Sequence, residues 1–342
     1  MKYDAVVVGG GPGGLKCAAL LADQGVKVLV LERKSRIGPK VCAGGITKGG
    51  LINALPPSLI QRAFSSQTIT TKYQHLVIDE TGPMIGTVNR HELGTHMAAE
   101  AAGSGAEIIT GARADTVSDD RVIYSLGDRS YEAHYDFLVG ADGSSSKVRK
   151  FLGIDSSPPL CGIGLHYLVG DAGDEMVWNF KADSFGSGYS WIFPHRDSAS
   201  VGAYLADGSI AALQLRKNLD RWLGEWGINC ADGRFEADKI NIDYRGWAFG
   251  SRFLVGDAAG LASPLTGEGI NPALVSAEAA AAAIIGSSAE PDTLQRIIKR
   301  HRSHRMMSST AGRSKLLALV LSELSGLLLR LKRLGFDKFE MA

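Results

Sequence analysis

Short apolar runs followed directly by glycines constrain the fold of this chain more than any other sequence feature. The first consists of the three valines at 6–8, and glycines follow at Gly9, Gly11 and Gly14. A valine-rich run of this length is typical of a buried parallel strand. In the spacing G-x-G-x-x-G, the first glycine permits a tight turn, the second lets a pyrophosphate approach the backbone, and the third lets the next helix pack on the strand. The pattern predicts a strand–turn–helix unit that binds a dinucleotide.

The residues that follow complete this unit. Small and apolar side chains recur at helical spacing and predict a helix over 13–24, whose N-terminal amides would face the phosphates. Residues 26–31 predict the second strand, and Glu32 ends it, where a carboxylate can accept hydrogen bonds from a ribose. A glycine-rich turn that binds nothing is the alternative, and the flanking strands and the acid argue against it.

Two later segments distinguish a flavin from a nicotinamide. One apolar run leads into Asp142, and another leads into Asp257, whose carboxylate can hold a ribityl hydroxyl of FAD. Residues 267–271 then open an alanine-rich helix over 272–285. Free amides at that helix start would face the pyrimidine edge of a flavin, where the reduced cofactor carries negative charge. NAD-binding folds need no such third segment, so we predict FAD.

The three segments resemble those of the p-hydroxybenzoate hydroxylase superfamily of flavoproteins. Residues 189–194 read YSWIFP and match the Y-x-W-x-F-P pattern of the geranylgeranyl reductase family. Residues 40–45, KVCAGG, are similar to the cysteine–glycine loop that this family places beside the flavin, with Ala43 standing where many relatives carry glycine or a different small pattern. The resemblance covers about residues 1–285.

The resemblance also implies which residues contact the cofactor. Arg90 starts a predicted helix and matches an arginine that commonly approaches the FAD phosphates, although a solvated helix start is the alternative. The full set of FAD contacts that we predict is Gly9, Gly11, Pro12, Gly13, Gly14, Glu32, Arg33, Cys42, Ala43, Gly45, Arg90, Ala114, Asp142, Asp257, Gly269, Ile270 and Asn271.

An aromatic strand is the predicted substrate site. Tyr189, Trp191 and Phe193 alternate and therefore share one face of a strand. Beside a flavin, such a face would form an apolar cavity suited to a flat or polyprenyl substrate, and we predict all three as substrate-binding residues. Ordinary sheet core is the alternative. Cys42 also has two interpretations, a small buried apolar side chain or a catalytic proton donor beside the flavin.

The predicted fold is α/β, with a Rossmann-like FAD-binding domain interleaved with an antiparallel-sheet substrate domain and followed by C-terminal helices. The predicted FAD-binding domain is discontinuous, and so is the substrate domain. The boundaries are 1–68, 89–157 and 245–289 for the FAD-binding domain, 69–88 and 158–244 for the substrate domain, and 290–342 for the C-terminal helical segment.

The composition limits the number of domains and the kinds of ligand and cell compartment that fit this chain. The 342 residues suffice for two domains with a sizeable core, and the formal net charge of +1 excludes a global field that attracts nucleic acids. The eight histidines show no zinc pattern, and the four cysteines lack the paired spacing of a disulfide framework. Because the first strand is predicted to begin by residue 4, we expect no signal peptide and a cytoplasmic protein without a metal.

Residues 315–334 predict an amphipathic helix with leucines on one face and basic residues on the other. The run is too short and too polar to span a bilayer. Either this helix packs on the substrate domain, or it binds a membrane surface, which would place the enzyme at the inner face of the cell membrane.

The predicted function is an FAD-dependent reductase that saturates carbon–carbon double bonds of a prenyl, geranylgeranyl-type lipid or precursor by hydride transfer from reduced flavin. The alternatives are a flavin monooxygenase of the same superfamily and a non-catalytic membrane-associated flavoprotein. The electron donor would be NADPH or ferredoxin, since only one nucleotide fingerprint occurs in the sequence.

Overall fold

The computed structural model describes residues 1–47, 52, 55–154, 160–286 and 292–341. Its first layer is an eight-stranded sheet with a parallel centre. The parallel strands follow the order β18-β11-β1-β2-β8, and β17, β9 and β10 are antiparallel additions. Their bounds are β1 (Lys2–Val8), β2 (Val28–Glu32), β8 (Glu107–Thr110), β9 (Ala112–Val117), β10 (Arg121–Leu126), β11 (Arg129–Gly140), β17 (Ala248–Phe249) and β18 (Arg252–Leu254).

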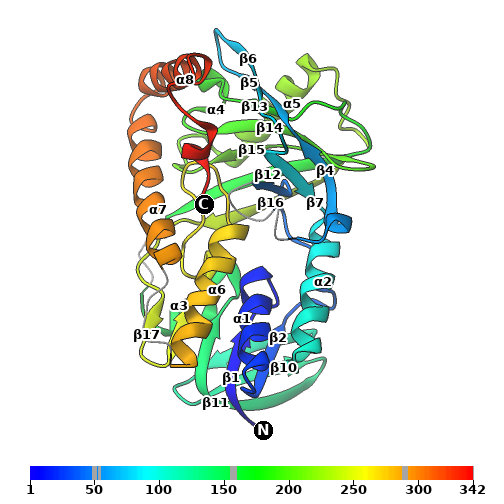
Figure 1. Ribbon diagram of the computed structural model, residues 1–342, viewed down its shortest axis with the longest axis vertical. Coiled ribbons are helices and arrows are strands. Elements are labelled where there is room, and N and C mark those ends of the chain that lie inside the picture. The colour runs from blue at the N-terminus through cyan, green and yellow to red at the C-terminus, as the bar shows by residue number, and fades with distance from the viewer. Residues whose placement is uncertain (48–51, 53–54, 155–159, 287–291, 342) are drawn as a thin grey trace.

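Three helices lie side by side on one face of this sheet (Figure 1). They are α1 (Pro12–Asp23), α2 (Arg90–Gly103) and α6 (Ile270–Ile284), and they bury one apolar core against the strands. The short helix α3 (Lys147–Phe151) and the one-turn helices η2 (Gly143–Ser145) and η3 (Gly256–Ala258) follow β11 and β18. This order of strand, turn and helix is the one the apolar runs and glycines predict.

A second sheet of seven strands occupies the other end of the molecule (Figure 1). Every pair in it is antiparallel except β13 with β5. Helices α4 (Ala182–Phe185) and α5 (Ala212–Glu225) belong to this end, and α5 packs its apolar side on one face of the sheet. In spatial order the strands are β16 (Arg234–Asn241), β12 (Cys161–Val169), β15 (Ala199–Leu205), β14 (Tyr189–Pro194), β13 (Val177–Asn179), β5 (Ser66–Thr70) and β6 (His75–Asp79).

A third, three-stranded sheet departs from the expected boundaries. It contains β3 (Gly45–Thr47), β7 (Ile85–Val88) and β4 (Ile60–Phe64), and η1 (Pro57–Leu59) precedes β4. We expected residues 69–88 to leave for the substrate sheet as one unit. Instead β5 already joins that sheet from Ser66, while β7 pairs with β3 and β4. The turn between β4 and β5 holds a single serine, without the glycine or proline that marks such breaks.

The C-terminal segment forms two long helices, α7 (Asp292–Ala311) and α8 (Lys315–Arg330), and the one-turn helix η4 (Phe336–Phe339). Helix α8 ends four residues before the predicted position, and Lys332 adopts a φ of 52° in the turn that follows. Among the described residues, no helix is long and apolar enough to cross a membrane. The chain then turns back toward the protein, and Met341 is fully buried.

Candidate active site

A cavity of about 420 Å³ lies between the carboxyl ends of the parallel strands and the second sheet. Ligands of doubly wound sheets bind at this edge, where loops and helix N-termini converge. Of the FAD contacts that we predicted, all except Asn271 line this cavity, and so do the three predicted substrate residues. The cavity thus brings together segments that lie more than 250 residues apart in sequence.

The glycines after β1 differ in what they permit. A Cβ on Gly9 would lie 2.3 Å from the carbonyl oxygen of Ala141, and a Cβ on Gly14 would lie 2.0 Å from the carbonyl oxygen of Gly9. These two positions therefore admit only glycine because the backbone packs there. A Cβ on Gly11 would meet nothing within 4 Å, so the backbone there is open to an approaching group. That is the place where the fingerprint predicts a pyrophosphate.

Arg90 provides the clearest test of whether the cofactor fits. The side chain of Asn89 accepts hydrogen bonds from the amides of His91 and Glu92, which fixes the start of α2 and the position of Arg90. Among the described residues, the Nε and Nη1 atoms of Arg90 are buried without a hydrogen-bond partner. Buried guanidinium donors require an acceptor, and a diphosphate supplies charged oxygens. The residues present therefore fit FAD.

Glu32 lies where the ribose of a nucleotide is expected, and its orientation is fixed. One carboxylate oxygen accepts a hydrogen bond from the amide of Gly10 at 2.7 Å, and the other accepts one from the amide of Lys34 at 2.8 Å. Each oxygen keeps a further lone pair for a hydroxyl group. The neighbouring Arg33 and Lys34 also line this end of the cavity.

Asp257 is bonded more closely than the sequence predicted. Its Oδ2 accepts hydrogen bonds from Lys40 Nζ at 2.6 Å and from Ser144 Oγ at 3.2 Å, and the carboxyl group is nearly buried. Lys40 lies in the cysteine–glycine loop, and sequence reasoning did not assign it to the site. The loop motif predicts that Lys40 lies near the flavin. No local sequence pattern predicts its bond to Asp257, because the two residues are 217 positions apart.

The side chain of Asp142 bonds to backbone amides at the start of α3. Its Oδ2 accepts hydrogen bonds from the amides of Lys147 at 2.6 Å and Val148 at 3.3 Å, and this holds the start of α3. Its Oδ1 is buried without a hydrogen-bond partner among the described residues, and burial raises the pKa of this carboxyl group. Asp142 lines the cavity, and a donor from a bound cofactor is one way in which this oxygen would be satisfied.

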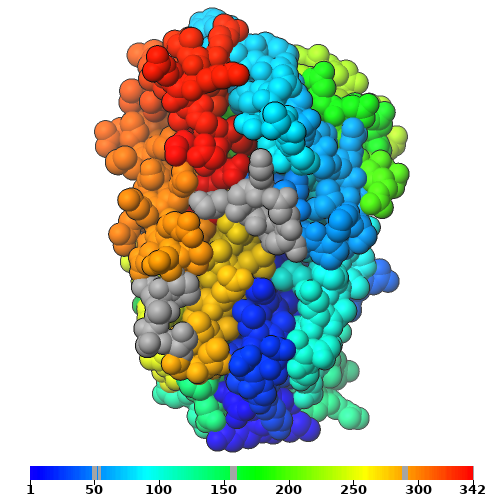
Figure 2. Space-filling model, viewed as in Figure 1, coloured from blue at the N-terminus to red at the C-terminus, as the bar shows by residue number. Residues whose placement is uncertain are grey.

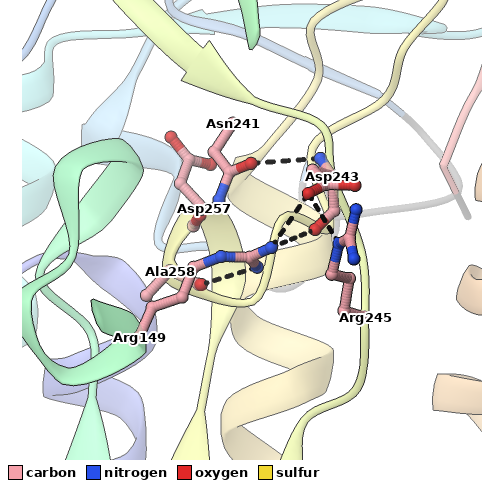
Figure 3. Close-up of polar contacts among 6 residues, drawn as sticks. All are labelled: Arg149, Asn241, Asp243, Arg245, Asp257 and Ala258. Carbon is pink, nitrogen blue, oxygen red and sulfur yellow. Dashed lines mark hydrogen bonds and ion pairs between the residues drawn. The ribbon is translucent and has the colours of Figure 1, made fainter. Parts of the chain in front are cut away.

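A polar cluster, drawn in Figure 3, links the end of β16 to the segments that follow β11 and β18, and so joins the two large sheets. Arg149, which is 3% exposed, donates from Nη2 to the carbonyl oxygen of Asp243 at 2.7 Å and to its carboxylate at 3.2 Å. Asn241, the last residue of β16, donates from Nδ2 to the carbonyl oxygen of Asp257 at 2.9 Å. Arg149 does not line the cavity. Its role is therefore to fix the backbone that carries Asp257.

The aromatic strand forms the apolar wall of the cavity. Tyr189, Trp191 and Phe193 all lie on its lining and are each less than 7% exposed. The polar groups of Tyr189 and Trp191 already have hydrogen-bond partners. Tyr189 Oη donates to the carbonyl oxygen of Thr266 at 2.6 Å, and Trp191 Nε1 donates to Ser200 Oγ at 3.1 Å. The rings are therefore both sheet core and cavity wall.

Trp178 belongs to the same wall and was not predicted. It lies on β13, beside β14, with ring centroids 4.7 Å from Phe193 and 5.4 Å from Tyr189. The apolar pair Val177-Trp178 is its only sequence signal, because β13 has just three residues. The pairing of β13 with β14, which brings Trp178 opposite Trp191, is a tertiary contact.

Cys42 lies on the cavity wall and is partly exposed. Its Sγ accepts a hydrogen bond from the amide of Gly44 at 3.3 Å, which orients the thiol within the loop. His195 bonds through Nε2 to the carbonyl oxygen of Ala43 at 3.1 Å and braces the loop from β14. Burial lowers the pKa of His195, so this ring is neutral and donates to the carbonyl. A catalytic role for Cys42 stays a prediction.

The C-terminal end of the chain closes one side of the cavity, which the sequence did not predict. Phe336, Phe339 and Glu340 line it, and the Phe336 ring lies 5.7 Å from Trp178. Asn271 Nδ2 donates to the carbonyl oxygen of Met341 at 2.7 Å. The side chain of Asn271 thus holds the chain end, whereas we predicted it as a cofactor contact.

Glu268 is a further site residue that our prediction left out. It lies in the Gly-Glu-Gly turn before α6, and its Oε2 accepts a hydrogen bond from the amide of Met341 at 2.9 Å. Burial raises the pKa of Glu268 to about 7, and the negative charge of the nearby Glu340 adds to the rise. The cavity wall therefore holds a carboxyl group that keeps its proton into the neutral range.

Comparisons with known proteins bear on the fold and the cofactor. Residues 2–163 match the family model of an FAD binding domain. Over 326 residues the chain is 28% identical to digeranylgeranylglycerophospholipid reductase 1 of Methanopyrus kandleri, an alignment that covers 88% of this chain and 85% of that protein. The resemblance to geranylgeranyl reductases and the FAD cofactor are thereby confirmed.

Solved structures confirm the fold. A geranylgeranyl bacteriochlorophyll reductase-like protein from Thermoplasma acidophilum aligns with a TM-score of 0.79 at 23% identity, covering 94% of this chain and 91% of that chain. A probable FAD-dependent monooxygenase from Pseudomonas aeruginosa aligns with a TM-score of 0.70 at 18% identity, covering 96% of this chain and all of that chain. At these identities the likeness shows the fold alone.

Proposed function

We propose that this FAD-dependent oxidoreductase, which is similar to geranylgeranyl reductases, saturates carbon–carbon double bonds in the prenyl chain of a lipid or lipid precursor. One observation carries the proposal. The three FAD segments and the aromatic wall of Trp178, Tyr189, Trp191 and Phe193 line the same cavity. A prenyl chain on that wall would lie beside the cofactor.

The wall can hold such a chain without polar recognition. Burying each methylene group contributes about 0.8 kcal/mol, so a branched hydrocarbon gains affinity along its length. The aromatic rings also exclude water from the double bond. When bound and reduced, FAD supplies the hydride for the alkene. Glu268, whose pKa burial raises to about 7, is a cavity carboxyl group that can hold a proton near neutral pH. Cys42 on the cavity wall stays the predicted proton donor.

Anaerobic product analysis tests the proposal against its alternatives. FAD-loaded protein is reduced with dithionite without oxygen and incubated with geranylgeranyl diphosphate or a digeranylgeranyl glycerophospholipid, and the products are identified by mass spectrometry. Saturated products without oxygen support the reductase. Hydroxylated products that appear only with oxygen would support a monooxygenase. Absence of turnover with both substrates would support the interpretation as a non-catalytic flavoprotein.

The electron donor is proposed to be external, either NADPH or ferredoxin. The described part of the chain offers one glycine fingerprint and one large cavity at a parallel sheet, which the FAD segments line. Stopped-flow reduction of the bound flavin by each donor distinguishes the two. We also propose that the protein works in the cytoplasm and contacts the inner face of the cell membrane through residues 315–334.

A further inference from the structure

The outer face of α8 is apolar and exposed. Leucine and valine side chains from Leu317 to Leu331 line it at spacings of three and four residues, and Leu316 extends the face. The best exposed of them, Leu316 and Leu331, are 68% and 57% exposed. On the surfaces of soluble proteins such side chains usually occur singly, so a continuous row of them indicates a binding surface. The row consists of Leu316, Leu317, Val320, Leu324, Leu327 and Leu331, and we call it the leucine row.

The opposite side of α8 is the side that packs on the protein. Ala318 and Gly326 are its buried residues. Gly326 faces the turn between β5 and β6, where a Cβ would lie 3.0 Å from Gln74 Nε2. We expected either packing on the substrate domain or binding to a membrane surface, and α8 does contact β6 and α4 of that domain. Within the part of the chain that the structure describes, the leucine row therefore stays exposed.

Glu323 fastens the helix to that turn. Its carboxylate accepts hydrogen bonds from Thr71 Oγ1 at 2.9 Å, from the amide of Tyr73 at 3.1 Å and from Gln74 Nε2 at 2.9 Å. It is the only acidic residue of α8. Its charge is thereby turned toward the protein, and the outer face of the helix presents no carboxylate.

The turn that Glu323 holds adds two exposed apolar residues. Tyr73 is 71% exposed, and Val77, on β6, is 56% exposed. The β5–β6 hairpin and α8 contact each other at the same end of the molecule, as Figure 2 shows with the hairpin in light blue beside the red C-terminal helix. Helix and hairpin therefore form one structural unit with apolar residues on both parts.

Basic residues lie at both ends of the leucine row. Arg313 and Lys315 precede it, Arg330 stands just before its last residue, Lys332 and Arg333 follow it, and all five are exposed. An apolar row between cations is complementary to a bilayer with anionic headgroups, where leucines enter the acyl boundary and cations meet phosphates.

We propose that the leucine row and the β5–β6 hairpin together form a docking surface for an anionic lipid bilayer. This proposal rests on the proposed function, because a water-insoluble prenyl substrate must enter from lipid. The inner side of α8 supports it, since Leu329 and the following Phe336 pack against the aromatic cluster of Trp178 and Tyr189. The same helix thus separates the surface from the cavity wall.

A second copy of the chain is the competing occupant. Positions 317, 320, 324, 327 and 331 follow the alternating spacing of a two-stranded coiled coil. The basic residues at both ends disfavour it as a parallel pair because like charges would meet. The experiment below distinguishes the two occupants.

Vesicle flotation of the full-length, FAD-loaded protein tests the docking surface. Vesicles of phosphatidylglycerol and phosphatidylcholine are compared with vesicles of phosphatidylcholine alone, at low and high salt. We expect binding to the anionic vesicles at low salt and its loss at high salt. The double variant Leu324→Ser/Leu327→Ser should bind roughly a hundredfold more weakly, since two leucine side chains no longer enter the lipid.

The hairpin variant Tyr73→Ser/Val77→Ser should also bind several-fold more weakly, although it leaves the helix intact. Leu213→Ser is the matched control, because Leu213 is 67% exposed on α5, outside this surface. Melting curves should show all variants as stable as the wild type, since the replaced side chains are exposed.

Three results would overturn the proposal: wild-type protein that stays unbound at low salt, hairpin and helix variants that float like the wild type, or a dimer in light scattering that the helix variant dissociates while no protein floats. Flavin reoxidation by a detergent-dispersed prenyl substrate is measured in parallel. It reports on the proposed function alone, so the two proposals fail separately.

Discussion

The surroundings of Asp257 fix its side chain at the position where we predict a contact with FAD. Its carboxylate is nearly buried, bonded to Lys40 and Ser144, and its backbone carbonyl is held by Asn241. A carboxylate fixed in this way needs little reorganisation to accept a further hydroxyl group. The sequence predicted the residue, whereas the partners that orient it come from three other segments.

The first prediction concerns retention of the cofactor. Asp257→Ala removes the acceptor that we expect for a ribityl hydroxyl, and a hydrogen bond to a charged group contributes about 1.5–3 kcal/mol. The dissociation constant of FAD, measured by fluorescence titration, should therefore rise roughly tenfold to a hundredfold. Asp136→Ala is the control, because Asp136 is exposed at a salt bridge with Lys2. An unchanged FAD affinity in Asp257→Ala would contradict the assignment.

The second prediction concerns the pH dependence of stability. Burial raises the pKa of Glu268 to about 7, above its value of about 4.3 in an unfolded chain. Between these values the folded protein keeps a proton that the unfolded chain has released, so this group lowers the free energy of unfolding as pH rises. Glu268→Gln removes the group and keeps an oxygen for the amide of Met341.

Melting temperatures of wild type and Glu268→Gln measured from about pH 5 to pH 8 check this sign. We expect the wild type to lose stability relative to the variant as pH rises. The buried His301 and His304, whose pKa values burial lowers to about 4, are present in both proteins and cancel in the difference. A difference that stays constant over the range would mean that Glu268 does not titrate there.

Among the strands and helices, β14 connects sequence to function most directly. Its alternating aromatics predict one face, and the structure places that face on the cavity. The interpretation as core is also correct for the same residues, because they are buried. Separating the two roles requires a variant that changes the cavity and a variant that changes only the core.

The third prediction uses two buried tryptophans for that purpose. Trp191→Ala and Trp222→Ala each remove a large core side chain, which costs about 3–5 kcal/mol of stability. Trp222 lies on α5 against the other face of the sheet and does not line the cavity. We expect both variants to melt earlier, and only Trp191→Ala to lose turnover on a long prenyl substrate far beyond its loss of flavin. Equal turnover of the two folded variants would contradict a substrate-binding role for Trp191.

Local patterns predicted some elements well. The helix predicted over 13–24 is observed as α1 (Pro12–Asp23), because glycine, proline and helical spacing specify it locally. Trp178, Lys40 and the inward turn of Phe336–Phe339 were missed. Each reaches the site through contacts with distant segments, and a short strand or a single side chain carries no periodic signal for such contacts.

The whole molecule depends on how its two large sheets are joined. Asp243 pairs with Arg149 and with Arg245 at 2.8 Å, and both Asp243 and Arg149 are buried. Breaking a buried ion pair from one side is strongly destabilising because it leaves a charge without its partner. This cluster adjoins Asp257, whose backbone carbonyl accepts a hydrogen bond from Asn241, so it also helps to position the predicted cofactor contact (Figure 3).

The fourth prediction is that Asp243→Asn lowers the free energy of unfolding by about 3–5 kcal/mol, as measured by urea denaturation. Arg245→Gln is the control, because its side chain is half exposed and its loss should cost much less. If the two variants lost equal stability, the buried pair would not be what holds the sheets together.

The central claim is that this flavoprotein reduces prenyl double bonds, and anaerobic single-turnover reoxidation of its flavin tests it most directly. The bound FAD is reduced with dithionite, a prenyl substrate is added without oxygen, and flavin absorbance and double bonds are measured together. The account predicts that oxidised flavin returns, with one double bond lost for each flavin reoxidised. Flavin that stays reduced with every prenyl substrate, and reoxidises only when oxygen is admitted, would contradict it.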